Sequence, residues 1–178
     1  MAPKPKVLVF LGTSRQGAAV VDALLASDKF EVYATTRSAK SAEALKAKGV
    51  KCGPFTCGDA ASAKAALDAA EPSLVFFTTL MGSRETEGSS GKIIVDAIKA
   101  YGGVQHVVYS SVADADKAPD AVGHFKSKLD VEDCVEIKIY GTFVLNHRVD
   151  LHAIDATPAR WRSDAVSSPL DGCTRRTA

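Results

Sequence analysis

The chain of 178 residues has the composition of a single globular domain, with 46% hydrophobic and 24% charged residues, which argues against disorder. Its formal net charge of +1 provides no bulk attraction to nucleic acid or anionic lipid. No apolar run approaches the roughly 18 residues of a membrane span, and the run at residues 7–11 is too short for a signal-peptide core. We therefore expect a soluble cytoplasmic protein, or one that is also nuclear, without membrane or direct nucleic-acid partners.

The four cysteines, Cys52, Cys57, Cys134 and Cys173, include no Cys-x-x-Cys pair. Without two closely spaced ligands a zinc site is not expected, so we predict no metal. In a protein without a secretory signal the cysteines are expected to be free thiols.

The first 136 residues alternate between short apolar runs and segments with helical spacing of apolar residues. The strands are apolar on both faces, as in a buried parallel sheet, although Gly53-Pro54 weakens the third. Five strands alternating with helices require right-handed crossovers, which predicts an α/β fold with a doubly wound parallel sheet. Strands are predicted at 6–11, 30–35, 50–57, 73–78 and 106–110, and helices at 17–27, 41–48, 61–70, 90–101 and 126–136.

The last part of the chain differs from the rest. All fourteen lysines lie at or before Lys138, whereas five of the eight arginines come after it. Periodicity fades beyond about Leu145, and two prolines, Pro158 and Pro169, punctuate the end. A tail of separate origin, such as a truncated or out-of-frame gene product, and an ordinary basic extension both remain open. We predict a domain over 1–136 followed by a divergent, irregular tail over 137–178.

The segment 10–17 joins the first predicted strand to the first predicted helix. In dinucleotide-binding folds this turn presents backbone amides and a helix N-terminus to a pyrophosphate, and glycine permits the close approach. A glycine-containing turn is also common as a plain connector, so the motif alone is weak. The residues predicted to bind cofactor in this turn are Gly12, Thr13, Ser14, Arg15, Gln16 and Gly17.

The end of the second predicted strand adds a second indication. Sites that prefer NAD usually carry an acidic residue there, to bind the ribose 2′-hydroxyl. This chain has Arg37 instead, with Ser38 and Lys40 nearby. A guanidinium suits a 2′-phosphate, so the βαβ pattern, the turn and Arg37 together predict a Rossmann-like domain that binds NADP(H).

Short motifs follow one another in a characteristic order over about residues 6–136. The most specific are the Arg15-Gln16-Gly17 turn and the pentapeptide His-Phe-Lys-Ser-Lys at 124–128. The order resembles that of the NmrA-like family, atypical members of the short-chain dehydrogenase/reductase superfamily. The motifs that carry the likeness lie at 9–17, 36–37, 49–50, 58–59, 77–79, 91–92, 96–97, 106–113 and 124–128.

The resemblance implies NADP(H) bound along the carboxyl edge of the sheet. Arg37 would meet the 2′-phosphate, Gly58 and Asp59 would lie beside the adenine, and Thr79 would lie near the nicotinamide. Lys92 and Lys128 would be bases that face the cofactor.

The turn of the family reads Gly-x-x-Gly-x-Gln-Gly. Aligned through Gln16-Gly17, its first two glycines fall on Leu11 and Ser14, and Gly12 sits one place late. Side chains at Leu11 and Ser14 would stand where the backbone must approach phosphate, an obstacle to tight binding.

The residues needed for hydride chemistry are only partly present. Short-chain reductases pair Tyr-x-x-x-Lys with a serine at the end of the fifth strand. Here Ser110 and Ser111 stand at that end, but His124 occupies the tyrosine position before Lys128. A histidine could shuttle a proton near neutral pH, so Lys128 and His124 are the candidate catalytic pair. The alternative interpretation is that His124 is an ordinary residue at the start of a helix and takes no part in catalysis.

Three hypotheses remain open. Several NmrA-like proteins also lack the tyrosine and are regarded as redox sensors, which implies a regulatory domain that binds NADP(H) with little or no catalysis. The alternatives are an NADPH-dependent oxidoreductase of quinones or small carbonyls, and a truncated, ligand-free interaction module. Family members carry a second half, and the strand that leads into it is not recognisable at 137–145. Apolar faces that this second half normally covers would be exposed, which would favour a protein partner or aggregation.

Overall fold

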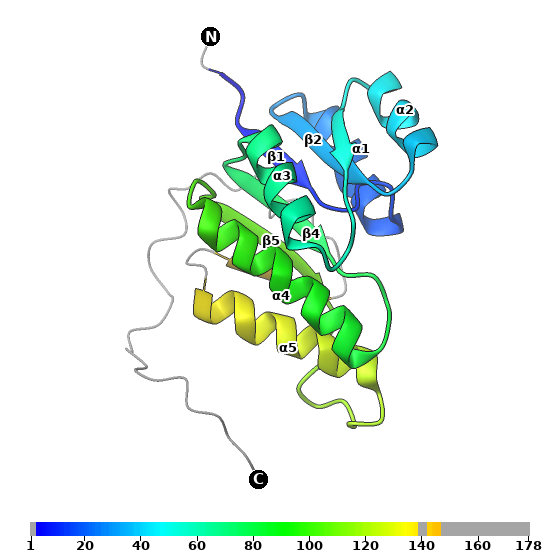
Figure 1. The fold of residues 1–178 in the computed structure, drawn as a ribbon, viewed down its shortest axis with the longest axis vertical. Coiled ribbons are helices and arrows are strands. Elements are labelled where there is room, and N and C mark those ends of the chain that lie inside the picture. The colour runs from blue at the N-terminus through cyan, green and yellow to red at the C-terminus, as the bar shows by residue number, and fades with distance from the viewer. Residues whose placement is uncertain (1–2, 139–141, 147–178) are drawn as a thin grey trace.

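The computed structural model describes residues 3–138 and 142–146, which form a six-stranded sheet with helices on both faces (Figure 1). All neighbouring strands are parallel, in the order β3-β2-β1-β4-β5-β6. The strands are β1 (Lys6–Val9), β2 (Glu31–Thr36), β3 (Lys51–Pro54), β4 (Leu74–Thr78), β5 (His106–Ser111) and β6 (Thr142–Asn146). The helices are α1 (Arg15–Ser27), α2 (Ala39–Ala47), α3 (Ala60–Ala70), α4 (Arg84–Tyr101) and α5 (Gly123–Lys138).

Alternation along the central strand produces two separate cores. Val7 and Val9 join a cluster with side chains of α1 and α2, whereas Leu8 and Phe10 join a cluster with side chains of α3, α4 and α5. The last three helices lie side by side over one face of the sheet (Figure 1). Each fully buried side chain of this kind contributes roughly 1.5–3 kcal/mol, so burial on both faces explains the uninterrupted apolar run of β1.

Four helices begin with a capping side chain. Ser14, Ser38, Asp59 and Ser83 each accept a hydrogen bond from a backbone amide two or three residues further on. In a parallel sheet each of these helices starts just after the carboxyl end of a strand, so their N-termini gather at one edge. The helix dipoles give that edge a partial positive charge that favours anions.

The predicted α/β, doubly wound parallel architecture is confirmed, with all five expected strands and all five expected helices present. The α4 helix begins at Arg84 rather than at Ser90. Its first two turns are polar and glycine-containing, so apolar spacing marks only its later part, while the Ser83 cap and the acidic Glu85 and Glu87 favour the earlier start.

The sixth strand was not expected from the sequence. β6 pairs in parallel with β5 and overlaps residues 137–145, where no strand is recognisable from the sequence. Its length is not the reason, since the predicted strands β1, β3 and β4 are no longer; β6 lies beyond the last family motif, and its pairing with β5 defines it. Most of the predicted tail, residues 147–178, lies outside the described residues.

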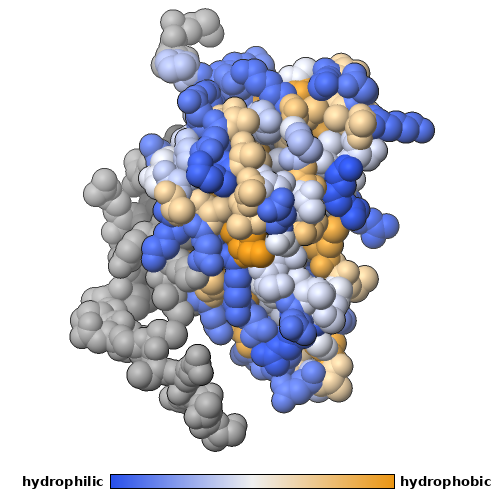
Figure 2. All heavy atoms as spheres, viewed as in Figure 1, coloured by the Kyte–Doolittle hydropathy of each residue, from blue (hydrophilic) through white to orange (hydrophobic). Residues whose placement is uncertain are grey.

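The face covered by α3, α4 and α5 is mixed: hydrophilic side chains alternate with apolar and intermediate areas (Figure 2). In the part of the chain that the structure describes, no helix combines the length and apolar character needed to cross a membrane.

The contact between α4 and α5 depends on a glycine. A Cβ at Gly91 would overlap the buried Val131 side chain of α5 and lie 3.1 Å from Cγ2 of Thr79. A Cβ at Gly88, one turn earlier, would meet only ordinary contacts with α5, at 3.7 Å or more. Because β-branched Val131 has little rotamer freedom, the helices can pack closely only without a side chain at Gly91.

We expect Gly91→Ala to lower the free energy of unfolding by about 1–3 kcal/mol, because overpacking forces α4 and α5 apart. Gly88→Ala is the matched control: it should be neutral or stabilising by up to about 1 kcal/mol, since alanine favours the helix. Urea unfolding of both variants measures the difference, and similar losses for the two would contradict this account of the interface.

Candidate functional site

The turn after β1 leaves amides open at the start of α1. The Gly12 amide donates to the Thr35 carbonyl at 2.8 Å, and the Gly17 amide donates to the Ser14 hydroxyl at 3.1 Å. The amides of Arg15 and Gln16 make no hydrogen bond within residues 3–138 and 142–146. They are unsatisfied donors at a helix N-terminus, which is the arrangement that binds a phosphate.

Both glycines of the turn are also required by packing. A Cβ at Gly12 would lie 2.7 Å from the Cβ of Ala34 in β2, and a Cβ at Gly17 would overlap the Leu11 carbonyl oxygen. Because they lack side chains, Gly12 allows the turn to pack against β2 and Gly17 allows the start of α1 to pack against the Leu11 backbone. Both contacts are needed whether or not a ligand binds.

Leu11 takes the backbone conformation that a glycine would normally supply. Its φ of 55° is left-handed, which costs a leucine roughly 1–2 kcal/mol. The side chain is 3% exposed and belongs to the core cluster of α3, α4 and α5. It therefore lies inside the core rather than over the turn, and the obstacle expected at Leu11 is absent. The Ser14 side chain caps α1 and uses one of the N-terminal amides, that of Gly17.

The end of β2 carries an exposed cation. Arg37 is exposed and makes no hydrogen bond or ion pair with the described residues. Burial raises the pKa of Cys57, which follows β3, and the positive charge of Arg37 partly opposes that shift. Lys40 is also exposed, in the first turn of α2. The Thr36 and Thr13 hydroxyls lie 3.3 Å apart, linking the end of β2 to the turn after β1.

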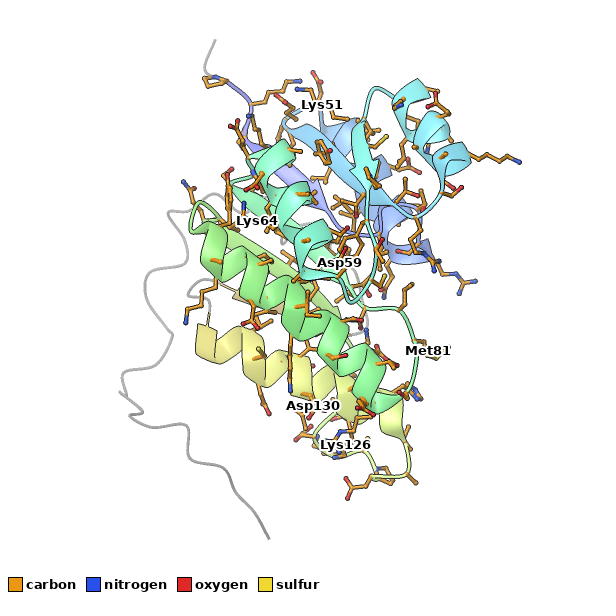
Figure 3. All side chains as sticks on the ribbon, in the orientation of Figure 1. Lys51, Asp59, Lys64, Met81, Lys126 and Asp130 are labelled. Atoms are coloured by element: carbon orange, nitrogen blue, oxygen red, sulfur yellow. The ribbon has the colours of Figure 1, made fainter. Side chains whose placement is uncertain are left out.

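Two further predicted residues lie at the start of α3. Gly58 has a left-handed φ of 80°, and a Cβ there would lie 3.6 Å from the Ser90 hydroxyl of α4. The Asp59 carboxylate caps α3 by accepting from the Ala61 amide at 2.9 Å. Figure 3 labels Asp59 at this helix start and Met81, 82% exposed, in the loop after β4.

The end of β4 connects the turn to a buried cluster of polar side chains. The Thr78 hydroxyl donates to the Gln16 side-chain oxygen at 3.0 Å. The next hydroxyl, that of Thr79, donates to Glu87 Oε1 at 2.6 Å and accepts from Lys128 Nζ at 2.7 Å. The sheet edge thus holds two adjoining groups of polar residues, one exposed around α1 and one buried around Thr79.

The Lys128 ammonium is enclosed on several sides. Its Nζ lies 3.2 Å from Glu87 Oε1, 3.4 Å from the Ser110 carbonyl oxygen and 5.4 Å from the centre of the Tyr109 ring. The Lys128 and Glu87 side chains are 14% and 1% exposed. Burial lowers the pKa of Lys128, and the neighbouring carboxylates of Glu87 and Glu132 oppose that shift.

Glu87 was not identified from the sequence. It lies in a polar stretch that precedes the helix predicted at 90–101. The available signal was its spacing from the apolar residues of α4: Glu87, Gly91, Ile94 and Ile98 fall on one buried helical face. An earlier helix start would have placed Glu87 among core residues.

The serines at the end of β5 have separate contacts. Ser110 is buried and presents its carbonyl oxygen to Lys128. The Ser111 hydroxyl donates to Glu132 of α5. Neither serine hydroxyl is hydrogen-bonded to Lys128.

Two predicted site residues are not brought into these clusters. His124 is exposed at the start of α5, and its ring packs edge-on against Phe125 with centroids 4.7 Å apart. Lys92 is exposed in an open pocket between α4 and α5, together with the ion pair of Arg84 and Asp130 (Figure 3). None of the turn or strand-end residues discussed above lines that pocket.

The residues from 3 to 138 and from 142 to 146 contain no group of three or more histidine, cysteine or acidic side chains placed to hold a metal ion.

Comparison with known proteins gives consistent relatives. An NmrA-like family domain-containing oxidoreductase, notA, from Aspergillus sp. (strain MF297-2) is 36% identical over 118 residues, covering 61% of this chain and 34% of that protein. An NmrA-like family domain-containing protein from Dictyostelium discoideum is 32% identical over 137 residues, covering 75% of this chain and 43% of that protein. The matched part of the chain thus spans less than half the length of each of these relatives.

Solved structures share the fold at low sequence identity. The NADPH-dependent quinone oxidoreductase QOR2 of Escherichia coli matches with a TM-score of 0.68 and 20% identity, over 79% of this chain and 48% of that one. The triphenylmethane reductase of Citrobacter sp. matches with a TM-score of 0.70 and 19% identity, over 83% and 51%.

The model of the NmrA-like family matches residues 3–147, which extends through β6 and beyond the expected limit near 136. Since this match covers most of the chain, the protein belongs to the NmrA-like family.

Proposed function

We propose that this domain binds NADP(H) along the carboxyl edge of its sheet. The observation that carries the proposal combines two features without a partner among the described residues: the Arg15 and Gln16 amides at the start of α1, and the exposed Arg37 at the end of the neighbouring strand β2. The amides suit a pyrophosphate, and the guanidinium suits a ribose 2′-phosphate.

The remaining predicted residues would extend the site in both directions along this edge. Gly58 and Asp59 would lie beside the adenine, and Thr79 and Lys128 would lie at the nicotinamide end. Two of the solved structures that share this fold support the assignment. The quinone oxidoreductase is described in complex with NADPH, and the triphenylmethane reductase is described in complex with NADP(H).

The first prediction concerns cofactor binding itself. NADPH at millimolar concentration should raise the melting temperature of the protein, because a ligand that binds only the folded state stabilises it by about 2.7 kcal/mol at a hundredfold excess over Kd. A thermal-shift titration measures this effect. A melting temperature that does not move would contradict the proposal and favour the ligand-free interaction module.

The second prediction concerns the choice between NADP and NAD. Arg37→Ala should weaken NADPH binding roughly 10–150-fold, the equivalent of one charge-assisted contact of about 1.5–3 kcal/mol, and hardly change NADH binding. Titration calorimetry measures both affinities. Lys64→Ala, on the exposed surface of α3, is the matched control because it removes the same charge away from the site. Equal losses of NADPH and NADH affinity in Arg37→Ala would show that Arg37 does not read the 2′-phosphate.

We further propose a regulatory, redox-sensing role with little or no catalysis, in which bound NADP(H) changes the association with a protein partner. Two observations support it. Lys128 already has three polar neighbours, Thr79, Glu87 and the Ser110 carbonyl, and the residue four positions before it is the exposed His124 instead of a tyrosine. This arrangement holds a cation without an evident acid to deliver a proton.

A second candidate is an NADPH-dependent oxidoreductase of quinones or small carbonyls. It is favoured by the desolvated Lys128 beside Thr79 at the proposed nicotinamide end, where NADPH would supply a hydride. The names of the Aspergillus relatives also include the word oxidoreductase.

The third prediction separates the two roles. With a panel of quinones, the sensor should oxidise NADPH no faster than the protein-free background, measured by absorbance of the reduced cofactor. Turnover that disappears in Lys128→Ala and persists in Lys64→Ala would overturn the sensor role and establish the oxidoreductase.

A further inference from the structure

A buried ion pair joins α4 to α5 beneath the carboxyl edge of the sheet. Glu87 Oε1 and Lys128 Nζ are 3.2 Å apart, and the Thr79 hydroxyl donates to the first and accepts from the second. Removing two charges from water is costly, and only close geometry with further hydrogen bonds compensates for that cost. Thr79 provides such a bond to each partner.

The contacts of Lys128 also hold its ammonium at a defined place on the sheet edge. Thr79 directly follows β4, and Ser110, whose carbonyl oxygen lies 3.4 Å from Lys128 Nζ, is near the end of β5. These strands are neighbours, so the ammonium is held at their adjoining carboxyl ends. Glu87 approaches from α4 and is the closest opposite charge to it.

We propose that Glu87 is a positioning residue, which holds the Lys128 ammonium at the ends of β4 and β5 so that Lys128 can contact the nicotinamide end of the cofactor. This inference rests on the proposed NADP(H) site. Glu87 itself is 1% exposed and contacts Lys128 directly, so it acts through Lys128 rather than on a ligand.

The other groups around Lys128 cannot replace Glu87. Glu132 lies on the same helix as Lys128, and its carboxylate accepts a hydrogen bond from Ser111. The Tyr109 ring offers only its face, at 5.4 Å, and burial raises the pKa of its hydroxyl. Without Glu87 the ammonium would therefore be buried with a weaker counter-charge.

The first experiment measures stability against pH without cofactor, in wild type, Glu87→Gln, Lys128→Met and the double variant. In Glu87→Gln the pKa of folded Lys128 falls further below that of the unfolded chain. The unfolded state then binds more protons, so the melting temperature should rise more steeply with pH between neutrality and about pH 10 than in wild type.

The two other variants complete the stability cycle. Lys128→Met leaves the Glu87 carboxylate buried without its cation, so this protein should be less stable than wild type. The double variant should lack the steeper pH slope of Glu87→Gln, and it should lose less stability than the two single variants lose together. A Glu87 that served only in packing would instead cause a loss independent of pH that persists in the double variant, and this result would overturn the proposal.

Failure of Glu87→Gln to fold would also be informative. If the double variant folds, the unpaired ammonium caused the failure, as the proposal requires. If the double variant is unfolded too, packing at Glu87 caused it and the proposal is wrong.

The second experiment measures NADPH affinity in the same proteins at neutral pH. Glu87→Gln and Lys128→Met should each weaken binding by roughly tenfold or more, and the double variant should be no weaker than either single variant. Additive losses would mean that Glu87 does not act through Lys128. Asp130→Asn is the matched control, because it breaks the exposed Arg84–Asp130 pair between the same two helices and should leave NADPH affinity unchanged.

The two experiments separate the two proposals. If wild type does not bind NADPH but the steeper pH slope of Glu87→Gln appears and is absent from the double variant, the cofactor assignment fails while the pairing of Glu87 with Lys128 stands. If NADPH binds but Glu87→Gln changes neither slope nor affinity, the positioning role fails while the cofactor site stands.

Discussion

The parallel direction of the strands is the constraint on which the rest of this molecule depends. Because all six strands point the same way, each helix that follows one begins at the same edge of the sheet. The capped N-termini of α1, α2, α3 and α4 consequently share that edge, and their dipoles favour an anion there. Residues more than a hundred positions apart in the chain, Gln16 and Lys128, consequently contact adjacent residues at the end of β4, Thr78 and Thr79.

The two ends of the proposed site differ in their physical character. Around α1 the groups available to a ligand are backbone amides and an exposed guanidinium, which bind charge at little cost in desolvation. Around Thr79 the groups are enclosed and already hydrogen-bonded to one another. The first end is suited to hold a phosphorylated ligand, and the second is suited to keep one cation in a fixed place.

Leu11 shows how a turn can carry a leucine at a left-handed position without placing the side chain over the turn. A left-handed residue with a side chain is strained, but the Leu11 side chain is buried in the apolar core on the α3–α5 side. Burial of a leucine contributes roughly 1.5–3 kcal/mol, comparable to the cost of the backbone conformation. Leucine at this position therefore costs backbone strain, gains core packing, and leaves the amides of Arg15 and Gln16 without a hydrogen-bond partner among the described residues.

The sequence by itself determined the fold class, the turn after β1 and the position of Arg37, because these depend on local spacing: apolar runs, capping residues and the first residue beyond a strand. It did not identify β6, which lies beyond the last family motif and is defined as a strand by its pairing with β5. Nor could it show that Lys92 lies between α4 and α5, apart from the turn and strand ends, or that the Leu11 side chain enters the core. Only the tertiary structure brought Glu87 to Lys128, because an ion pair between two helices depends on how those helices pack, and Gly91 permits the close approach.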